Sequence, residues 1–208
     1  RARKANEDGI FLNEIVPVKT VSKKQELLID KDEQPFKSKI EKITSLKPAF
    51  KKNGTVTAAN SSSISDGASS IILMRLSEAE RRGLQPIAKI LGHSTNSQEP
   101  KWFTTAPIGA IKKLLDKVNW KKNEVDLYEI NEAFAVVPMA VIKELSLPHN
   151  IINVNGGACA LGHPVGASGA RIITTLINAL KRNNLNKGVA SLCIGGGEAT
   201  AMALEIIN

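Results

Sequence analysis

Apolar positions beyond residue 85 recur at two spacings that indicate alternating helices and strands. Spacings of three and four residues, typical of helices with one buried face, extend over residues 107–118, 134–145 and 169–182. Short apolar runs, typical of strands, occupy residues 86–91, 125–130, 151–154, 188–194 and 199–207. The order β-α-β-α-β-α-β-β predicts an α/β domain with a mostly parallel sheet. The last two strands must be antiparallel, because residues 195–197 are too few for a crossover.

The first 63 residues lack this periodicity. Charged residues are frequent there and three prolines interrupt short apolar runs, which is typical of a loop region with little core of its own. Residues 69–76 form an apolar run that predicts a buried strand, with a helix as the alternative. An exposed helix is expected next, from a capping box of Ser77 and Glu80 to a stop at Gly83.

The composition is that of an ordinary globular chain, with 42% apolar and 23% charged residues among 208. No apolar run reaches the roughly 18 residues of a membrane-spanning helix. The net charge is +8, and the first 52 residues hold 13 Lys and Arg against 8 Asp and Glu. Such a region is either a solvated face or an attractor of phosphorylated partners. It lacks the interleaved aromatic side chains of a nucleic-acid surface, so neither nucleic acid nor a membrane is the expected partner.

Two cysteines in a chain of this length do not make a disulfide framework, which favours a reducing compartment. The chain starts at Arg1 without a signal peptide, and we expect it to begin inside a longer protein. The cytoplasm is the expected location, or the mitochondrion if the source is a eukaryote.

Asn131–Ala135 follows the predicted strand 125–130 directly. Ligands of open α/β sheets bind beyond the carboxyl ends of strands, where an asparagine holds a water or a substrate oxygen. Alternatively, Asn131 is only a turn or cap residue.

Residues 155–169 contain five glycines, which are costly in chain entropy unless backbone must turn sharply or approach a ligand. The segment is neither a Walker loop nor a dinucleotide-binding loop. His163 lies within it, and a histidine in this position is a candidate base or oxyanion donor.

Cys193 closes an apolar strand and is followed by Gly195, Gly196 and Gly197. A buried cysteine is most often an inert small apolar residue. Here the glycine N–H groups offer an oxyanion hole, and a nearby histidine is expected to lower the pKa of the thiol.

These three motifs follow residues 54–62 and 65–68 in the order and spacing of a known family. With them, the sequence resembles the C-terminal half of a thiolase, of the acetyl-CoA acetyltransferase type. The resemblance implies a thiolase fold with a mixed sheet. It divides the chain into a CoA-binding portion of the loop domain (1–63), the end of the N-terminal core domain (64–84) and the C-terminal core domain (85–208). The N-terminal half, which carries the acyl-accepting cysteine of thiolases, is expected to lie outside this chain.

The resemblance also implies four catalytic roles. His163 corresponds to the histidine that activates the acyl-accepting cysteine and lines the first oxyanion hole. Asn131 corresponds to the asparagine that holds a water in that hole. Cys193 corresponds to the cysteine that takes the α-proton of acetyl-CoA, and Gly195 to the glycine whose N–H helps to form the second oxyanion hole.

Five further positions match the CoA-binding tunnel of the family. Ser62 corresponds to a serine that contacts the pantetheine arm, and the lining positions are Ala58, Ile64, Ala133 and Phe134. The resemblance implies no metal and no covalently bound cofactor, with CoA and acetyl-CoA entering as substrates. The basic first quarter of the chain would then face the phosphates of CoA.

The implied activity is the condensation of two acetyl-CoA molecules to acetoacetyl-CoA and CoA, and the reverse thiolysis, within fatty acid metabolism. A homodimer or homotetramer of the complete subunit is expected to catalyse it, and the isolated chain is expected to be inactive. Two alternatives stay open, a non-catalytic CoA-binding or oligomerisation fragment and a 3-ketoacyl-CoA thiolase of longer-chain specificity. A β-ketoacyl synthase is less favoured, because its histidine or asparagine would replace Cys193.

Overall fold

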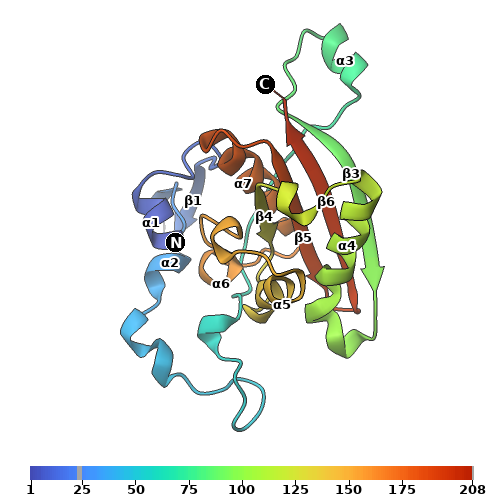
Figure 1. The fold of residues 1–208 in the computed structure, drawn as a ribbon. Helices are drawn as coiled ribbons and strands as arrows, with labels where there is room; N and C mark the ends of the chain where they lie inside the picture. The colour runs from blue at the N-terminus through green and yellow to red at the C-terminus, as the bar shows by residue number, and fades with distance from the viewer. Residues whose placement is uncertain (23–24, 208) are drawn as a thin grey trace.

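A four-stranded mixed sheet forms the centre of the computed structural model, which describes residues 1–22 and 25–207 (Figure 1). The strands are β3 (Ala88–Ser97), β4 (Leu127–Ile130), β5 (Lys187–Ile194) and β6 (Glu198–Ile206), in the order β3-β6-β5-β4. β4 and β5 are parallel, whereas β6 pairs antiparallel with both β5 and β3. The expected β5–β6 hairpin is confirmed. The expectation of a mostly parallel sheet is wrong, because β3 pairs with the returning strand β6 rather than with β4.

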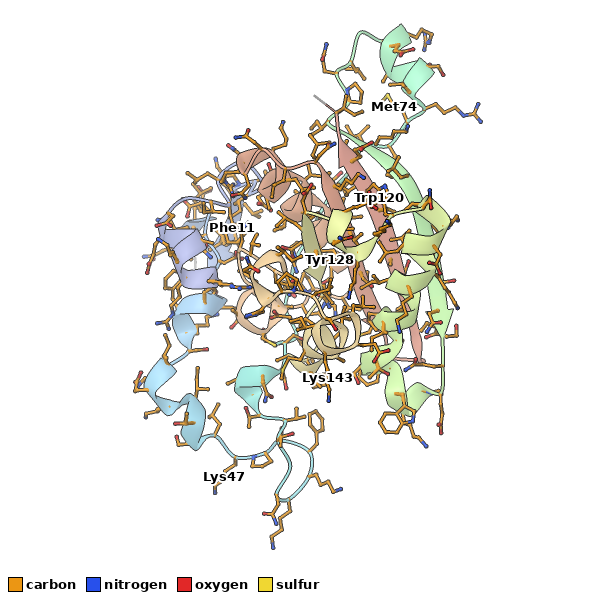
Figure 2. The ribbon with its side chains drawn as sticks, in the orientation of Figure 1. Phe11, Lys47, Met74, Trp120, Tyr128 and Lys143 are labelled. Carbon is orange, nitrogen blue, oxygen red and sulfur yellow. The ribbon has the colours of Figure 1, made fainter. Side chains whose placement is uncertain are left out.

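Helices cover both faces of this sheet. α4 (Ala106–Val118) and α5 (Val136–Leu145) pack on one face with Tyr128 and Ile130. α7 (Ser168–Arg182) packs on the other face with Leu127 (Figure 1). The three helices predicted beyond residue 85 are confirmed. Figure 2 shows Tyr128 at the centre of the molecule, between these layers.

The strand predicted over residues 151–154 is wrong. Residues 149–151 form a 3-10 turn, and a single bridge joins Ile152 to Tyr128. Asn153 has a φ of 46°, which extended strands exclude. The Asn153 side chain makes the hydrogen bonds to β4 that the backbone of a paired strand would make. Its Oδ1 accepts from the Ile130 N–H and its Nδ2 donates to the Ile130 carbonyl, both at 2.8 Å.

The buried strand predicted over residues 69–76 is also wrong. Residues 66–75 belong to no helix or strand, and Ile72 and Leu73 are 84% and 69% exposed. An apolar run becomes a strand only beside another strand, and the described residues offer it none. Figure 2 shows Met74 on this outlying segment, away from the sheet.

The helix expected after this segment is present as α3 (Leu76–Arg81). Its N-cap is Arg75, which makes no side-chain cap hydrogen bond, so the capping box of Ser77 and Glu80 is not formed. Gly83 follows the helix with a φ of 65°, which confirms the predicted glycine stop.

The first 63 residues form short elements on the outside of the core, as the weak periodicity predicts. They comprise α1 (Ala2–Glu7), the hairpin β1 (Val18–Ser22) and β2 (Gln25–Ile29), α2 (Gln34–Lys37), and the 3-10 turns η1 (Ile40–Ser45) and η2 (Ala58–Asn60). The other short elements of the chain are η3 (Pro100–Thr105), η4 (Lys122–Glu124), η5 (His149–Ile151) and α6 (Ala158–Leu161). Among the described residues, none of the helices has the length and apolarity needed to cross a bilayer.

Candidate active site

Asn131 and His163 meet beyond the carboxyl end of β4. The Asn131 Nδ2 lies 3.3 Å from the His163 Nε2. The Asn131 backbone N–H also donates to the Ser191 carbonyl of β5 at 2.9 Å, which fixes the asparagine at the edge of the sheet. Asn131 is 1% exposed, and its Oδ1 is buried without a hydrogen-bond partner among the described residues. Two residues that the sequence places 32 positions apart thus share one site.

Ser168, the first residue of α7, fixes the tautomer of His163. The Ser168 Oγ lies 2.6 Å from His163 Nδ1 and donates its own proton to the Pro164 carbonyl at 3.0 Å. The Asn131 Nδ2 donates to Nε2, which leaves the single proton of the neutral ring on Nδ1, from where it donates to the Ser168 Oγ. The Nε2 atom on the Asn131 side is therefore unprotonated and available as a base.

Electrostatics favour the neutral imidazole. Burial lowers the pKa of His163 from its ordinary value, and the positive charge of Arg171 lowers it further. Gly162 precedes the histidine with a φ of 92°, and a Cβ there would lie 2.3 Å from the Ser65 Oγ. A glycine at this position is therefore what lets the chain turn the imidazole toward Asn131.

Cys193 lies at the end of β5, on the face that packs against α4 and α5. Burial raises the pKa of its thiol to about 11, so the expectation of a lowered pKa is wrong. The following turn closes through the Gly197 N–H and the Ile194 carbonyl at 3.1 Å. Gly195 in this turn is exposed, and a Cβ on it would meet open space, so a ligand can approach its backbone closely.

Residues 60–64, which are the last residue of η2 and the chain that follows it, cross the site. The Ala135 N–H donates to the Asn60 carbonyl at 2.9 Å, and the Ser62 N–H donates to the Ala133 carbonyl at 3.0 Å. At its other end, the segment accepts from the His163 N–H through the Ser63 carbonyl at 3.1 Å. The structure thereby brings four of the five CoA-binding candidates together, namely Ser62, Ile64, Ala133 and Phe134.

Aromatic and exposed apolar side chains surround this segment. Phe134 contacts Phe50 and Phe103 edge to face, with ring centroids 6.0 and 6.1 Å apart. Ile64 is 99% exposed although it is apolar and adjoins His163 through a parallel bridge. Ala58, the fifth candidate, is exposed in η2 and takes no part in these hydrogen bonds and bridges.

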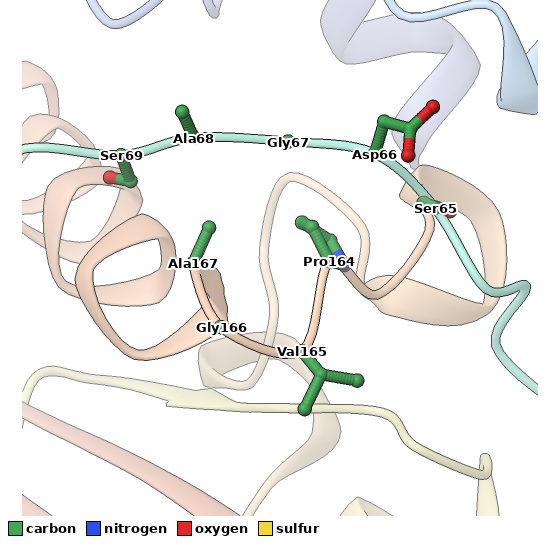
Figure 3. A pocket seen from close by; sticks show the side chains of 9 residues that line it. All are labelled: Ser65, Asp66, Gly67, Ala68, Ser69, Pro164, Val165, Gly166 and Ala167. Carbon is green, nitrogen blue, oxygen red and sulfur yellow. The ribbon is translucent and has the colours of Figure 1, made fainter.

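A cavity of about 380 Å³ lies next to the histidine loop (Figure 3). Its walls are the extended segment 65–69 and the loop 164–167, and Figure 3 shows Pro164 and Ala167 facing that segment. A Cβ on Gly67 would lie 2.7 Å from the Pro164 Cγ, so the two walls approach as closely as a glycine allows.

Cys159, the second cysteine, is unsuited to nucleophilic chemistry. Burial and the neighbouring Glu132 carboxylate raise the pKa of its thiol to about 12. Glu132 accepts from the Cys159 N–H at 3.2 Å and from the Asn153 Nδ2 at 2.9 Å, so it braces the glycine-rich loop. No group of side chains suited to a metal ion occurs within residues 1–22 and 25–207.

Sequence reasoning missed Ser168 and Arg171. Ser168 lies within the glycine-rich segment but carries no signal of its own, because its contact with His163 depends on the turn between them. Arg171 resembles any helix-surface arginine in the sequence. The sequence relates the two residues only by their spacing. Ser168 precedes Arg171 by one helical turn, on the helix that follows the His163 loop.

The structure places a histidine–asparagine pair and a cysteine–glycine turn at the same edge of the sheet, on an α/β core, and family comparison identifies the class of protein. The description "Thiolase, C-terminal domain" matches residues 84–206, and "Thiolase, N-terminal domain" matches residues 1–77. The chain belongs to the thiolase family.

Among its relatives, a "Probable acetyl-CoA acetyltransferase" of Dictyostelium discoideum is 50% identical over 99% of this chain and 50% of its own length. The acetyl-CoA acetyltransferase of Bacillus anthracis superposes with a TM-score of 0.95 at 46% identity, over 99% of this chain and 52% of that one. The Acat5 thiolase of Ascaris suum in complex with coenzyme A superposes with a TM-score of 0.86 at 41% identity. The match covers 99% of this chain and 52% of that one. The thiolase fold with its mixed sheet is thus confirmed. The chain spans about half the length of the relatives it matches.

Proposed function

We propose that the intact protein containing this chain is an acyltransferase of the thiolase type. It condenses two acetyl-CoA molecules to acetoacetyl-CoA and CoA, and catalyses the reverse thiolysis. The observation that carries this proposal is the neutral His163, whose Nδ1–H is held by Ser168 and whose Nε2 faces Asn131.

His163 serves as the base for an acyl-accepting cysteine, which the resemblance to thiolases places outside this chain. Its Nε2 takes the thiol proton as the sulfur attacks the acyl carbonyl. Nε2 gives up its hydrogen bond from the Asn131 Nδ2, which is long at 3.3 Å, when it takes this proton. The freed Asn131 amide then holds a water or donates to the oxyanion.

Cys193 moves the proton of the carbon acid. In thiolysis, breaking the carbon–carbon bond leaves the enolate of acetyl-CoA, and the protonated Cys193 thiol gives it a proton. In condensation, the thiolate of Cys193 takes the same proton from the methyl group of acetyl-CoA. The Gly195 N–H donates to the enolate oxygen in both directions.

CoA binds along the crossing segment. The Ser62 hydroxyl donates to the Ala133 carbonyl at 3.0 Å, so its oxygen remains free to accept from an amide N–H of pantetheine. Ile64, Ala133 and Phe134 supply apolar surface for the same arm, and Ala58 lies further along it. The excess of Lys and Arg in the first 52 residues suits the phosphates of CoA.

The division into 1–63, 64–84 and 85–208 is part of this proposal and agrees with a core that starts at β3 (Ala88–Ser97). A homodimer or homotetramer, and the cytoplasm or the mitochondrion as compartment, are further parts of it. Light scattering of the intact protein and fractionation of the source cells test these parts.

The test of the activity is an acetoacetyl-CoA thiolysis assay on the intact protein, with acetyl-CoA quantified by chromatography. Turnover that is lost in His163→Ala supports the proposal, and a 3-ketoacyl-CoA of longer chain tests the alternative specificity. Cys193→Ala is expected to abolish condensation while an acyl group still transfers to the protein. CoA binding by an intact protein without any turnover would establish the non-catalytic alternative.

A further inference from the structure

Glu132, the residue after Asn131, joins the end of β4 to the short helix that leads into His163. Its Oε2 accepts from the Cys159 N–H of α6 at 3.2 Å, and the Cys159 Sγ lies 3.8 Å from the Glu132 carbonyl oxygen. α6 ends at Leu161, and His163 follows two residues later. The carboxylate of Glu132 is thus connected to the main chain of His163 through one turn of helix.

The other carboxylate oxygen of Glu132 is tied to the sheet. Its Oε1 accepts from the Asn153 Nδ2 at 2.9 Å, and the same amide nitrogen donates to the Ile130 carbonyl of β4 at 2.8 Å. The Asn153 Oδ1 in turn accepts from the Ile130 N–H. Glu132 therefore links β4 to α6, with one oxygen directed to each.

Gly157, the N-cap of α6, lies against this carboxylate. A Cβ on Gly157 would overlap the Glu132 carboxyl group, so backbone and side chain are in direct contact there. The Gly157 carbonyl accepts from the N–H groups of Ala160 and Leu161, both at 3.0 Å. A shift of the Glu132 carboxylate is therefore transmitted to the whole of α6 and to the histidine beyond it.

The two partners of the Asn131–His163 contact are held by different elements. The Asn131 N–H donates to the Ser191 carbonyl of β5 at 2.9 Å, so the asparagine is anchored to the sheet. His163 is carried by α6, and its Nε2 lies 3.3 Å from the Asn131 Nδ2. Glu132 connects these two elements, because it follows Asn131 directly and hydrogen-bonds to α6.

Charge strengthens the hydrogen bonds of Glu132. Glu129, three residues earlier, is 2% exposed, and burial raises its pKa to about 8, so that carboxyl is neutral at pH 7. The negative charge of Glu132 adds to this rise. Hydrogen bonds to an ionised acceptor are roughly twice as strong as those between neutral groups. Of these two carboxyl groups, Glu132 is therefore the one suited to hold a loop.

We propose that Glu132 is a positioning residue for His163: its carboxylate holds α6 against the end of β4 and thereby sets the distance between the Asn131 amide and the His163 imidazole. Ser168 orients the imidazole ring from α7, whereas Glu132 fixes the main chain that carries it. The catalytic value of this distance rests on the proposed function, whereas the attachment of the loop does not.

The test compares Glu132→Ala with Asp126→Ala in the intact protein. Asp126 is the matched control, because its Oδ2 accepts from the N–H groups of Asn186 and Lys187 at 2.9 and 2.8 Å. It precedes β4, whereas Glu132 follows β4. Each variant thus removes a carboxylate that accepts two hydrogen bonds, at opposite ends of the same strand.

Two measurements are made on each variant. In Glu132→Ala, hydrogen–deuterium exchange of the segment 157–163 is expected to accelerate about tenfold, because α6 loses its attachment. The kcat for thiolysis is expected to fall by about tenfold to a hundredfold, with KM changed less than about twofold, since CoA binds along the crossing segment. In Asp126→Ala, exchange is expected to accelerate at residues 186–187, whereas kcat and the exchange of 157–163 stay within about twofold of the wild type.

Unchanged exchange of the segment 157–163 in Glu132→Ala would overturn the proposal. Faster exchange with an unchanged kcat would also overturn it, because Glu132 would then only stabilise the loop. If Glu132→Ala does not fold, Glu132→Gln gives the same test, since an amide can accept only one of the two hydrogen bonds. A wild-type protein without thiolysis activity would refute the proposed function, yet the exchange of 157–163 would still decide whether Glu132 holds the loop of His163.

Discussion

Ser168 and His163 are five residues apart in the chain and are joined by a side-chain hydrogen bond of 2.6 Å, although the serine is fully buried. The turn 164–167 folds the start of α7 back onto the imidazole. The same hydroxyl donates to the carbonyl four residues earlier, so one oxygen caps the turn and orients the base.

Ser168→Ala is therefore expected to lower kcat for thiolysis about tenfold with little change in KM, which corresponds to about 1.4 kcal/mol for an unmade buried hydrogen bond. Steady-state kinetics on the intact protein measure this. Thr174→Ala is the matched control, because the Thr174 Oγ1 donates to the carbonyl four residues earlier on the same helix, at 3.0 Å. Equal losses of kcat in the two variants would mean that Ser168 only stabilises the helix.

The reactivity of Cys193 is expected to follow its raised pKa. Burial holds the pKa of the thiol at about 11, so the thiolate fraction is small at neutral pH. Alkylation of Cys193 by iodoacetamide should accelerate about tenfold per pH unit between roughly pH 7 and 10. Peptide mass spectrometry measures this rate, and Cys159, with a pKa of about 12, serves as the slower internal reference. A rate that levels off below pH 9 would show that the thiolate is stabilised after all.

Glu129 is expected to make stability fall as pH rises. Its pKa in the folded protein is about 8, above the ordinary 4.5, so the folded state retains a proton that the unfolded state has released. The cost is absent below about pH 4.5 and reaches its full value above about pH 8. Glu129→Gln should therefore be more stable than the wild type at pH 8, by an amount on the order of a few kcal/mol, with a smaller difference at pH 5.5. Urea denaturation at both pH values measures this, and equal differences at both would contradict it.

Two glycines of the glycine-rich loop, Gly157 and Gly166, differ in whether the structure leaves room for a side chain. A Cβ on Gly157 would lie 2.1 Å from the Glu132 Cδ, which would displace the carboxylate from Asn153 and Cys159. Gly157→Ala is expected to cost about 2–4 kcal/mol of stability. Gly166→Ala, whose Cβ would meet nothing within 4 Å, is expected to change stability by less than about 0.5 kcal/mol. Thermal unfolding compares the two variants, and comparable shifts in Tm would refute the assignment.

The sequence predicted the helices best, because α4 and α7 bury one continuous face and their periodicity is local. It failed at residues 151–154, where a side-chain amide of Asn153 performs the pairing that backbone performs in a strand. It also failed at residues 69–76, because an apolar run does not state where its partner strand is. Pairing between distant segments is invisible to local pattern.

The candidate site was predictable where motif and position coincide. The strand-end positions of Asn131 and Cys193 follow from the alternation of strands and helices, whereas His163 follows the short helix α6 and was indicated only by its glycine-rich loop. The protonation states do not follow from the alternation, because they depend on burial and on charges brought by other segments. The expectation of an acidified Cys193 thiol failed for that reason: Cys193 is buried on an apolar face, which raises the pKa of its thiol.

The segment 60–64 reaches both the Asn131 loop and His163 through main-chain groups. Peptide geometry, which every amino acid except proline shares, therefore sets the width of the site across this crossing. Side chains along the crossing are free to diverge and retune what the site accepts without moving the catalytic groups apart. Substitutions that change which substrates the site accepts can therefore leave the positions of Asn131 and His163 unchanged.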